Sequence, residues 1–122
     1  MATIMVVDDS GYARRMHRRI LEGGGYTVIE ATSGMEALER YFLDRPDLVL
    51  LDLSMEDIGG LEVLGKLCEM DSAARVVIVS ADVQRSTERL AAEGGALAFV
   101  GKPVTPEQLL ATVGDLLQGV SS

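Results

Sequence analysis

The sequence has few of the residues that cross-link a chain or bind soft metals. Its one cysteine, Cys68, excludes both a disulfide framework within the chain and a zinc site built from several cysteines. Its one histidine, His17, belongs to a different stretch from the acidic residues discussed below, so a metal site would depend on carboxylate oxygens. We expect Cys68 to be a buried or half-buried helix residue, and His17 to lie at the surface or to be half-buried.

Long apolar runs are also lacking. None approaches the roughly 18 residues of a membrane-spanning helix, and the N-terminus has no basic region followed by an apolar stretch. We therefore expect a cytoplasmic protein without membrane insertion. No linker or low-complexity tract interrupts the 122 residues, which predicts one domain.

Positive charge is in the minority. The chain has 11 Lys and Arg against 19 Asp and Glu, a net charge of −8, and such a surface disfavours direct nucleic-acid binding because phosphates are repelled. The exception is a predicted helix that contains Arg14, Arg15, Arg18 and Arg19. This cluster is either a solvated helix face or a surface that attracts an acidic partner.

What the sequence does have is a regular alternation of short apolar runs and amphipathic segments. The apolar runs predict strands near residues 3–8, 26–30, 47–52, 75–80 and 96–100. The amphipathic segments predict helices near residues 11–22, 34–43, 60–70, 84–93 and 106–118. Five such units predict an α/β fold, doubly wound (βα)5, with a five-stranded parallel sheet in the order 2-1-3-4-5, the flavodoxin-like arrangement.

Two of the predicted helices show a clear apolar stripe. In the first, Tyr12, Met16 and Ile20 recur every four residues, which predicts that they face the core. In the last, the stripe consists of Leu109, Leu110, Val113, Leu116 and Leu117. Glycines after the first and fourth helices, Gly23–Gly25 and Gly94–Gly95, suit helix C-termini that need a left-handed residue.

Charged residues follow three of the predicted strands. Asp8 and Asp9 come after the first, Asp52 ends the third, and Lys102 follows the fifth. The carboxyl ends of parallel strands meet at one edge, so these side chains should gather there. Two carboxylates about 5 Å apart repel by roughly 3 kcal/mol at an effective dielectric constant near 20. Three acids with one base make a poor structural ion-pair cluster, so the pattern predicts a Mg²⁺ or Mn²⁺ site that also accepts a phosphoryl group.

The chain resembles the receiver domain of two-component response regulators, over about residues 2–118. The matching motifs are Val6–Ser10, Leu50–Met55, Val79–Ala81 and Val100–Pro103, each at the end of a predicted strand and in the order of the family. The resemblance is to a single-domain regulator of the chemotaxis type. We expect residues 1–118 to form the receiver domain and residues 119–122 to be a C-terminal tail or the start of a linker.

The resemblance implies roles for the acidic residues. Asp52 would be the phosphoacceptor, a carboxylate nucleophile that becomes an acyl phosphate. Asp9, Asp52 and the backbone carbonyl of Ser54 would bind Mg²⁺, with Asp8 acting through a water molecule. Ser54 would also tune the lifetime of the phosphate, together with Asp82.

The resemblance also implies roles at the fourth and fifth strands. Lys102, the hydroxyl of Ser80 and the backbone amide of Ala81 would stabilise the phosphoryl group. Ser80 and Phe99 would form the switch. Phe99 would favour an inward rotamer, because it has no hydroxyl group to keep in water. The alternative is that Phe99 is simply a core residue without a switching role. The Lys102–Pro103 peptide would be cis.

The chain departs from the family pattern in one loop. Glu56 stands four residues after Asp52, where many receivers have proline, and Asp57 follows it. We expect both to add negative charge beside the metal. Gly59–Gly60 replaces a more polar sequence, which predicts a looser loop.

The implied function is a signalling switch rather than an enzyme with turnover. It would take a phosphoryl group from the phosphohistidine of a sensor kinase or phosphotransfer protein, docked against Arg14, Arg15 and Arg18. The fourth helix, fifth strand and fifth helix would then bind a downstream protein, with the chain a monomer or a phosphorylation-dependent dimer. The alternatives are a receiver excised from a larger transcription factor or hybrid kinase and, more remotely, a haloacid-dehalogenase-like phosphatase, which would want an aspartate in place of Ser54.

Overall fold

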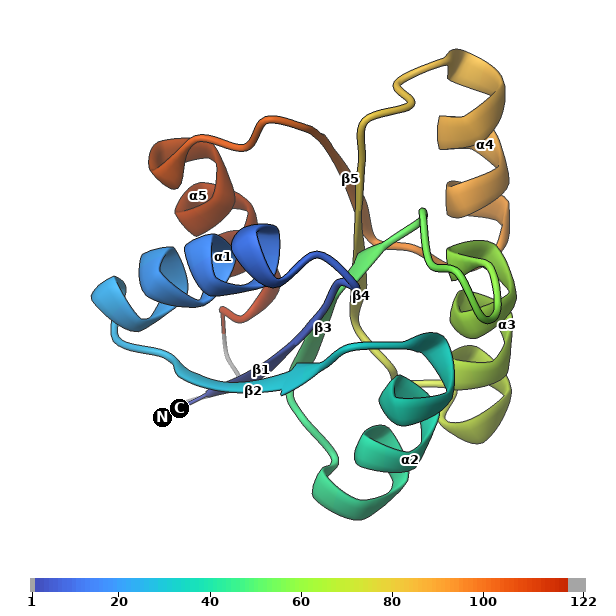
Figure 1. Cartoon of the computed structure of the whole chain (residues 1–122), viewed down its shortest axis with the longest axis horizontal. Helices are drawn as coiled ribbons and strands as arrows, with labels where there is room; N and C mark the ends of the chain where they lie inside the picture. The colour runs from blue at the N-terminus through green and yellow to red at the C-terminus, as the bar shows by residue number, and fades with distance from the viewer. Residues whose placement is uncertain (1, 119–122) are drawn as a thin grey trace.

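The computed structural model describes residues 2–118, so the predicted tail at 119–122 lies outside the described residues. Strands and helices alternate as β1 (Thr3–Val7), α1 (Gly11–Gly23), β2 (Thr27–Ala31), α2 (Gly34–Asp44), β3 (Leu48–Asp52), α3 (Gly60–Met70), β4 (Val76–Ser80), α4 (Arg85–Glu93), β5 (Ala98–Gly101) and α5 (Pro106–Leu116) (Figure 1). Each predicted element is present, and its ends fall within two residues of the prediction.

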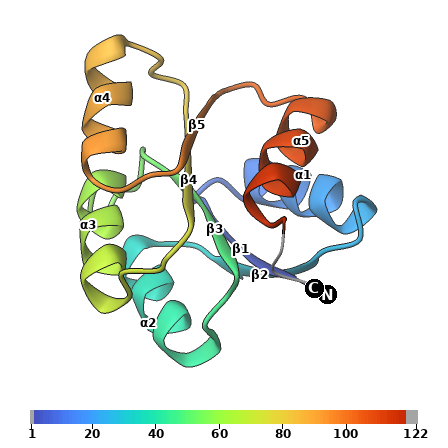
Figure 2. The same cartoon turned by 180° about the vertical axis from the view of Figure 1, so that it is seen from behind.

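The five strands form one parallel sheet in the order β2-β1-β3-β4-β5. Helices α1 and α5 cover one face, and α2, α3 and α4 cover the other, as Figures 1 and 2 show from opposite sides. The predicted doubly wound fold is therefore confirmed. The connection of each strand to the next through a helix forces this layering, because a parallel neighbour can be reached only by crossing over a face.

Side chains of each strand alternate between two apolar cores. Met5 and Val7 of β1 pack in the core under α2, α3 and α4, whereas Ile4 and Val6 pack in the core under α1 and α5. The strands β3 and β4 are buried at every position. A central strand covered on both faces has no solvated side, which explains why these strands appear in the sequence as continuous apolar runs.

The inward face of α1 differs from the predicted one. Tyr12 is 72% exposed, and Met16 is only half-buried. The buried residues are His17, which is 3% exposed, and Leu21. Ile20, the third residue of the predicted stripe, does pack against the core under α1 and α5. The prediction was wrong for Tyr12 and for His17, which was expected at the surface or half-buried. Burial lowers the pKa of His17, so that the neutral imidazole can occupy an apolar position.

Two glycine predictions have different outcomes. Gly25 and Gly95 have positive φ values of 94° and 112° just after α1 and α4, so the prediction of left-handed glycines at these helix ends is confirmed. For Gly59–Gly60 at the start of α3, the two glycines differ: a Cβ atom at Gly59 would meet nothing within 4 Å, whereas Gly60 is closely packed. The amide of Gly60 donates to the Leu53 carbonyl, and a Cβ atom at Gly60 would lie 2.6 Å from the Asp52 carbonyl oxygen.

Candidate phosphoryl site

Three carboxylates gather at the carboxyl edge of the sheet. Val7 of β1 is level with Leu51 of β3, so Asp8 comes level with Asp52 on the neighbouring strand. Asp8, Asp9 and Asp52 each offer an oxygen within 4.8 Å of the others. Asp8 is 1% exposed and Asp52 4%, whereas Asp9 is exposed. The sheet therefore brings together the three acids that the sequence predicted to meet.

Lys102 supplies positive charge to this cluster from the loop after β5. Its Nζ atom lies 3.3 Å from Asp8 Oδ2 and 3.5 Å from Asp52 Oδ1. The other oxygen of Asp8 accepts a hydrogen bond of 2.9 Å from the Ser10 amide. The Lys102–Pro103 peptide is cis. One ammonium group thus faces three carboxylates, and the cluster retains excess negative charge.

The electrostatic imbalance is visible at Asp52. Burial raises the pKa of Asp52, and the nearby charge of Asp8 raises it further. The Ser54 amide, which donates to Asp52 Oδ1 over 3.2 Å, and Lys102 both act in the opposite direction. The donor set consists only of oxygens, so the cluster could hold a hard divalent cation such as Mg²⁺, which prefers one or two carboxylates and keeps several water molecules.

Ser80 ends β4 at the same edge, and it is buried. Its Oγ atom accepts a hydrogen bond of 3.0 Å from the amide of Asp82. The carboxylate of Asp82 accepts from the amide of Gln84 over 3.1 Å and from the hydroxyl of Thr87 over 2.8 Å. These two bonds, the Thr87 hydroxyl first, lower the pKa of Asp82. Sequence reasoning missed Thr87, although an aspartate just before a helix is a recognisable capping signal.

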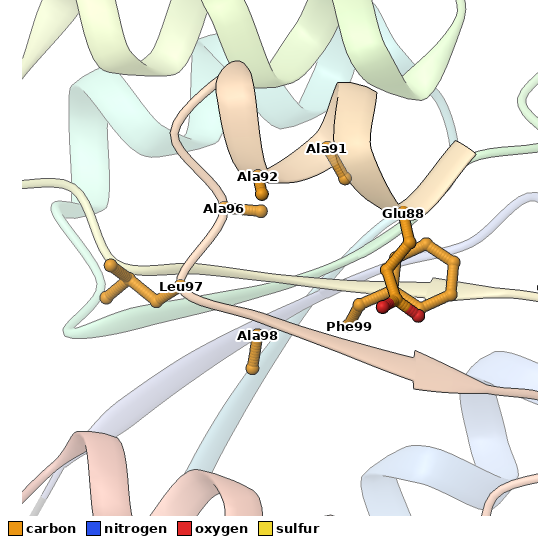
Figure 3. A pocket seen from close by; sticks show the side chains of 7 residues that line it. All are labelled: Glu88, Ala91, Ala92, Ala96, Leu97, Ala98 and Phe99. Carbon is orange, nitrogen blue, oxygen red and sulfur yellow. The ribbon is translucent and has the colours of Figure 1, made fainter. Parts of the chain in front are cut away.

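Phe99 lies on β5, the edge strand beside α4. It is half-buried and packs against the core under α2, α3 and α4. Figure 3 shows it in the lining of a pocket of about 270 Å³, together with Glu88 of α4 and with Ala91, Ala92, Ala96, Leu97 and Ala98. The small alanine side chains leave this space open between α4 and β5.

The arginines of α1 divide into two pairs. Arg14 donates to Glu30 over 2.7 Å and to the Asp8 carbonyl over 2.8 Å, and Arg18 bonds both Glu30 and Glu22. Arg15 and Arg19 are exposed, and neither forms an ion pair with another residue of the described chain. Two of the three arginines predicted to dock a partner are therefore already engaged within the molecule.

Asp57, which the sequence predicted to add negative charge beside the metal, is hydrogen-bonded to the start of α2. Its carboxylate accepts hydrogen bonds from the amides of Gly34 and Met35, over 2.9 and 3.0 Å, at the first turn of α2. These amides lower the pKa of Asp57. A helix N-terminus stabilises negative charge, so this contact, 23 residues apart in sequence, compensates the carboxylate.

These features define a doubly wound α/β domain with an acidic site at the carboxyl ends of its strands. Residues 4–114 match the family model described as the response regulator receiver domain, and the chain belongs to this family. It is 34% identical to the chemotaxis protein CheY of Bacillus subtilis, over 93% of this chain and 96% of that protein. It is 30% identical to the polar-differentiation response regulator DivK of Brucella anthropi, over 91% and 92% of the two chains.

Solved structures agree with the sequence relatives. A CheY-like receiver domain from Methanospirillum hungatei superposes with a TM-score of 0.92 at 27% identity, covering 97% of this chain and 94% of that one. A LuxR-family response regulator from Aurantimonas gives 0.92 at 34% identity, covering 98% and 86%. The chain is thus a two-component receiver homologous to CheY and DivK, and receiver domains are signalling switches that interact with kinases or phosphotransfer proteins. No helix within residues 2–118 is long and apolar enough to cross a bilayer.

Proposed function

We propose that Asp52 accepts a phosphoryl group from the phosphohistidine of a sensor kinase or phosphotransfer protein. The observation that supports this proposal most directly is the position of Asp52. It is buried at the end of β3, 3.5 Å from the Lys102 ammonium and grouped with Asp8 and Asp9. A carboxylate oxygen of Asp52 attacks phosphorus, the bond from phosphorus to the histidine nitrogen breaks, and its electron pair returns to the imidazole.

The surrounding residues stabilise the charge of the transferred group. Lys102 offsets negative charge from the side of Asp8 and Asp52, to which it is already paired. The hydroxyl of Ser80 and the backbone amide of Ala81 donate to phosphoryl oxygens. Mg²⁺ or Mn²⁺, bound by Asp9, Asp52 and the carbonyl of Ser54 and linked to Asp8 through water, would neutralise the phosphoryl charge.

Two surfaces would connect this site to partners. Among the arginines of α1, we assign docking of an acidic kinase or phosphotransfer surface to Arg15 and Arg19, because Arg14 and Arg18 are engaged within the molecule. The face formed by α4, β5 and α5, with the pocket beside Phe99, would bind the downstream protein. We further propose that residues 1–118 form the receiver domain and that it acts in the cytoplasm, where it would meet both the phosphodonor and the downstream protein.

The test is phosphorylation by a small-molecule phosphodonor in the presence of Mg²⁺, followed by intact mass measurement. We expect one phosphoryl group per chain, lost in Asp52→Asn and after removal of Mg²⁺. Asp115→Asn is the matched control, because Asp115 is an exposed acid on α5. Unchanged labelling of Asp52→Asn would overturn the assignment, and sustained turnover of many phosphate esters would favour the phosphatase alternative.

A further inference from the structure

A chain of hydrogen bonds connects the phosphoryl site to α4. Ser80 Oγ accepts from the Asp82 amide, and the Asp82 carboxylate accepts from the hydroxyl of Thr87 in the first turn of α4. The second oxygen of Asp82 is held by the amide of Gln84, the residue that precedes the helix. Both oxygens of Asp82 are therefore engaged with the start of α4.

The far end of this chain of bonds, Thr87, is the neighbour in sequence of a residue that lines the pocket between α4 and β5. Thr87 is half-buried and immediately precedes Glu88, which lines this pocket together with Phe99 (Figure 3). The amide of Glu88 closes the first turn of α4 by donating to the Gln84 carbonyl over 3.0 Å. A shift of this turn would thus change the lining of the pocket.

We propose that Thr87 is a positioning residue that acts through Asp82 on Ser80, and that the Asp82–Thr87 hydrogen bond is a latch for the unphosphorylated state. The proposal rests on the proposed function of Asp52. The latch keeps the segment between β4 and α4, and with it the Ser80 hydroxyl, in its resting position. Phosphorylation has to work against it.

The physical reason is the cost of an unpaired amide. If Ser80 Oγ turns toward a phosphoryl group on Asp52, the Asp82 amide either loses its acceptor or follows Ser80. If it follows, the Asp82 carboxylate is drawn away from Thr87, and the first turn of α4 is released. Because linkage is reciprocal, breaking the latch makes the phosphorylated arrangement easier to reach, and a phosphoryl group on Asp52 loosens α4.

The first test needs no phosphoryl group. Amide hydrogen exchange at Glu88, followed by NMR in the full chain, should become roughly two- to tenfold faster in Thr87→Val, the effect of losing one hydrogen bond. Ser80→Ala should have a similar effect on Glu88, because within residues 2–118 the Ser80 hydroxyl is linked to α4 through its hydrogen bond with the Asp82 amide. The double variant should exchange no faster than the faster of the two single variants, because both changes break the same chain of bonds.

The control for this test is Thr112→Val. Thr112 is half-buried on α5, and its hydroxyl makes no side-chain hydrogen bond within residues 2–118, so the same exchange of hydroxyl for methyl should leave Glu88 unaffected. If Ser80→Ala leaves exchange at Glu88 unchanged, or if the effects of Ser80→Ala and Thr87→Val multiply independently, the latch is overturned whether or not Asp52 is the phosphoacceptor.

The second test is a titration with beryllium fluoride, a phosphoryl mimic, in the presence of Mg²⁺. The midpoint concentration should fall roughly two- to tenfold in Thr87→Val and stay at the wild-type value in Thr112→Val. In a Ser80→Ala background, Thr87→Val should cause no further change. A wild-type chain that does not respond contradicts the proposed function, whereas a wild-type response with an unchanged Thr87→Val midpoint contradicts the latch alone.

Discussion

Among single residues, burial distinguishes the carboxylates of the acidic cluster. Asp52 and Asp8 are both almost completely buried, whereas Asp9 is exposed. Removing a carboxylate from water favours its protonated form, and the charge of Asp8 adds to this effect, so the pKa of Asp52 is raised. Only the ionised carboxylate can attack phosphorus or bind a cation, so Asp52 should lose these abilities at a higher pH than an ordinary aspartate would.

The first prediction concerns pH. The Asp52 carboxyl group should titrate above its ordinary pKa of 3.8, as followed by carbon-13 NMR of the carboxyl carbon. A pKa raised by folding means that the protonated form contributes stability, which is lost as pH rises through the folded-state pKa. Mg²⁺ affinity should change in the opposite direction and increase over the same pH range. Asp8→Asn should lower the midpoint of Asp52, and a midpoint at or below 3.8 in the wild-type chain would contradict the prediction.

The second prediction concerns Gly60, which packs against the end of β3. A Cβ atom there would lie 2.6 Å from both the Asp52 carbonyl oxygen and the Leu53 Cα atom. Backbone at this position cannot move without displacing Asp52, so Gly60→Ala should lower the free energy of unfolding by about 1–3 kcal/mol.

The control for Gly60 lies in the same helix. A Cβ atom at Gly65 meets nothing within 4 Å, so Gly65→Ala should stabilise α3 by about 0.5–1 kcal/mol. Urea unfolding of both variants checks the pair, and equal effects at the two glycines would contradict the packing argument.

At the scale of elements, α1 shows how tertiary contacts give residues of the same type different partners. Its four arginines look equivalent in sequence, yet β2 pairs with β1 and brings Glu30 to Arg14 and Arg18. Arg14 also bonds the Asp8 carbonyl, and so it ties the helix to the strand end that bears the acidic pair. The helix is thereby attached to the sheet by charge on one side and by Leu21 on the other.

The third prediction follows from this attachment. Arg14→Ala should lower the free energy of unfolding by about 1–3 kcal/mol, because the Asp8 carbonyl and one oxygen of Glu30, both partly buried, lose the Arg14 donor, while the other Glu30 oxygen keeps its bond to Arg18. Arg15→Ala should change it by no more than about 0.5 kcal/mol, since Arg15 is exposed. Chemical denaturation at low and high salt measures both. Arg14 is only 15% exposed, so its effect should persist in high salt, and its disappearance there would contradict the assignment.

At the scale of the whole molecule, charge is distributed unevenly. The net charge is −8, yet the exposed side of α1 presents Arg15 and Arg19 one turn apart without acidic partners among the described residues. A local positive patch on an acidic protein attracts an acidic partner to one place and orients it there.

The fourth prediction tests this patch. Arg15→Glu with Arg19→Glu should slow phosphotransfer from a phosphorylated histidine donor protein roughly tenfold at low salt, and the difference should shrink as salt is raised. The control is Arg85→Glu with Arg89→Glu, which changes the net charge equally through two exposed residues of α4. If both pairs slow the transfer alike, net charge alone is responsible, and if neither does, the docking assignment fails.

Much of the fold follows from local sequence patterns. The apolar runs at Leu48–Asp52 and Val76–Ser80 match buried strands, and their alternation with helical segments leaves few topologies open. The gathering of Asp8, Asp52 and Lys102 was also predictable, because parallel strands place their carboxyl ends at one edge whatever the details of packing.

The failures share one physical cause, which is that long-range contacts are not visible in local patterns. Whether His17 points inward depends on how α1 rotates against the sheet, and the charge of Asp57 is compensated only because α2 starts beside its loop. The pairing of Arg14 with Glu30 and of Thr87 with Asp82 likewise requires the folded chain. Strand ends and apolar periodicity are properties of the sequence alone, whereas the partner of each polar side chain is chosen by tertiary packing, because that choice depends on distances between segments far apart in the chain.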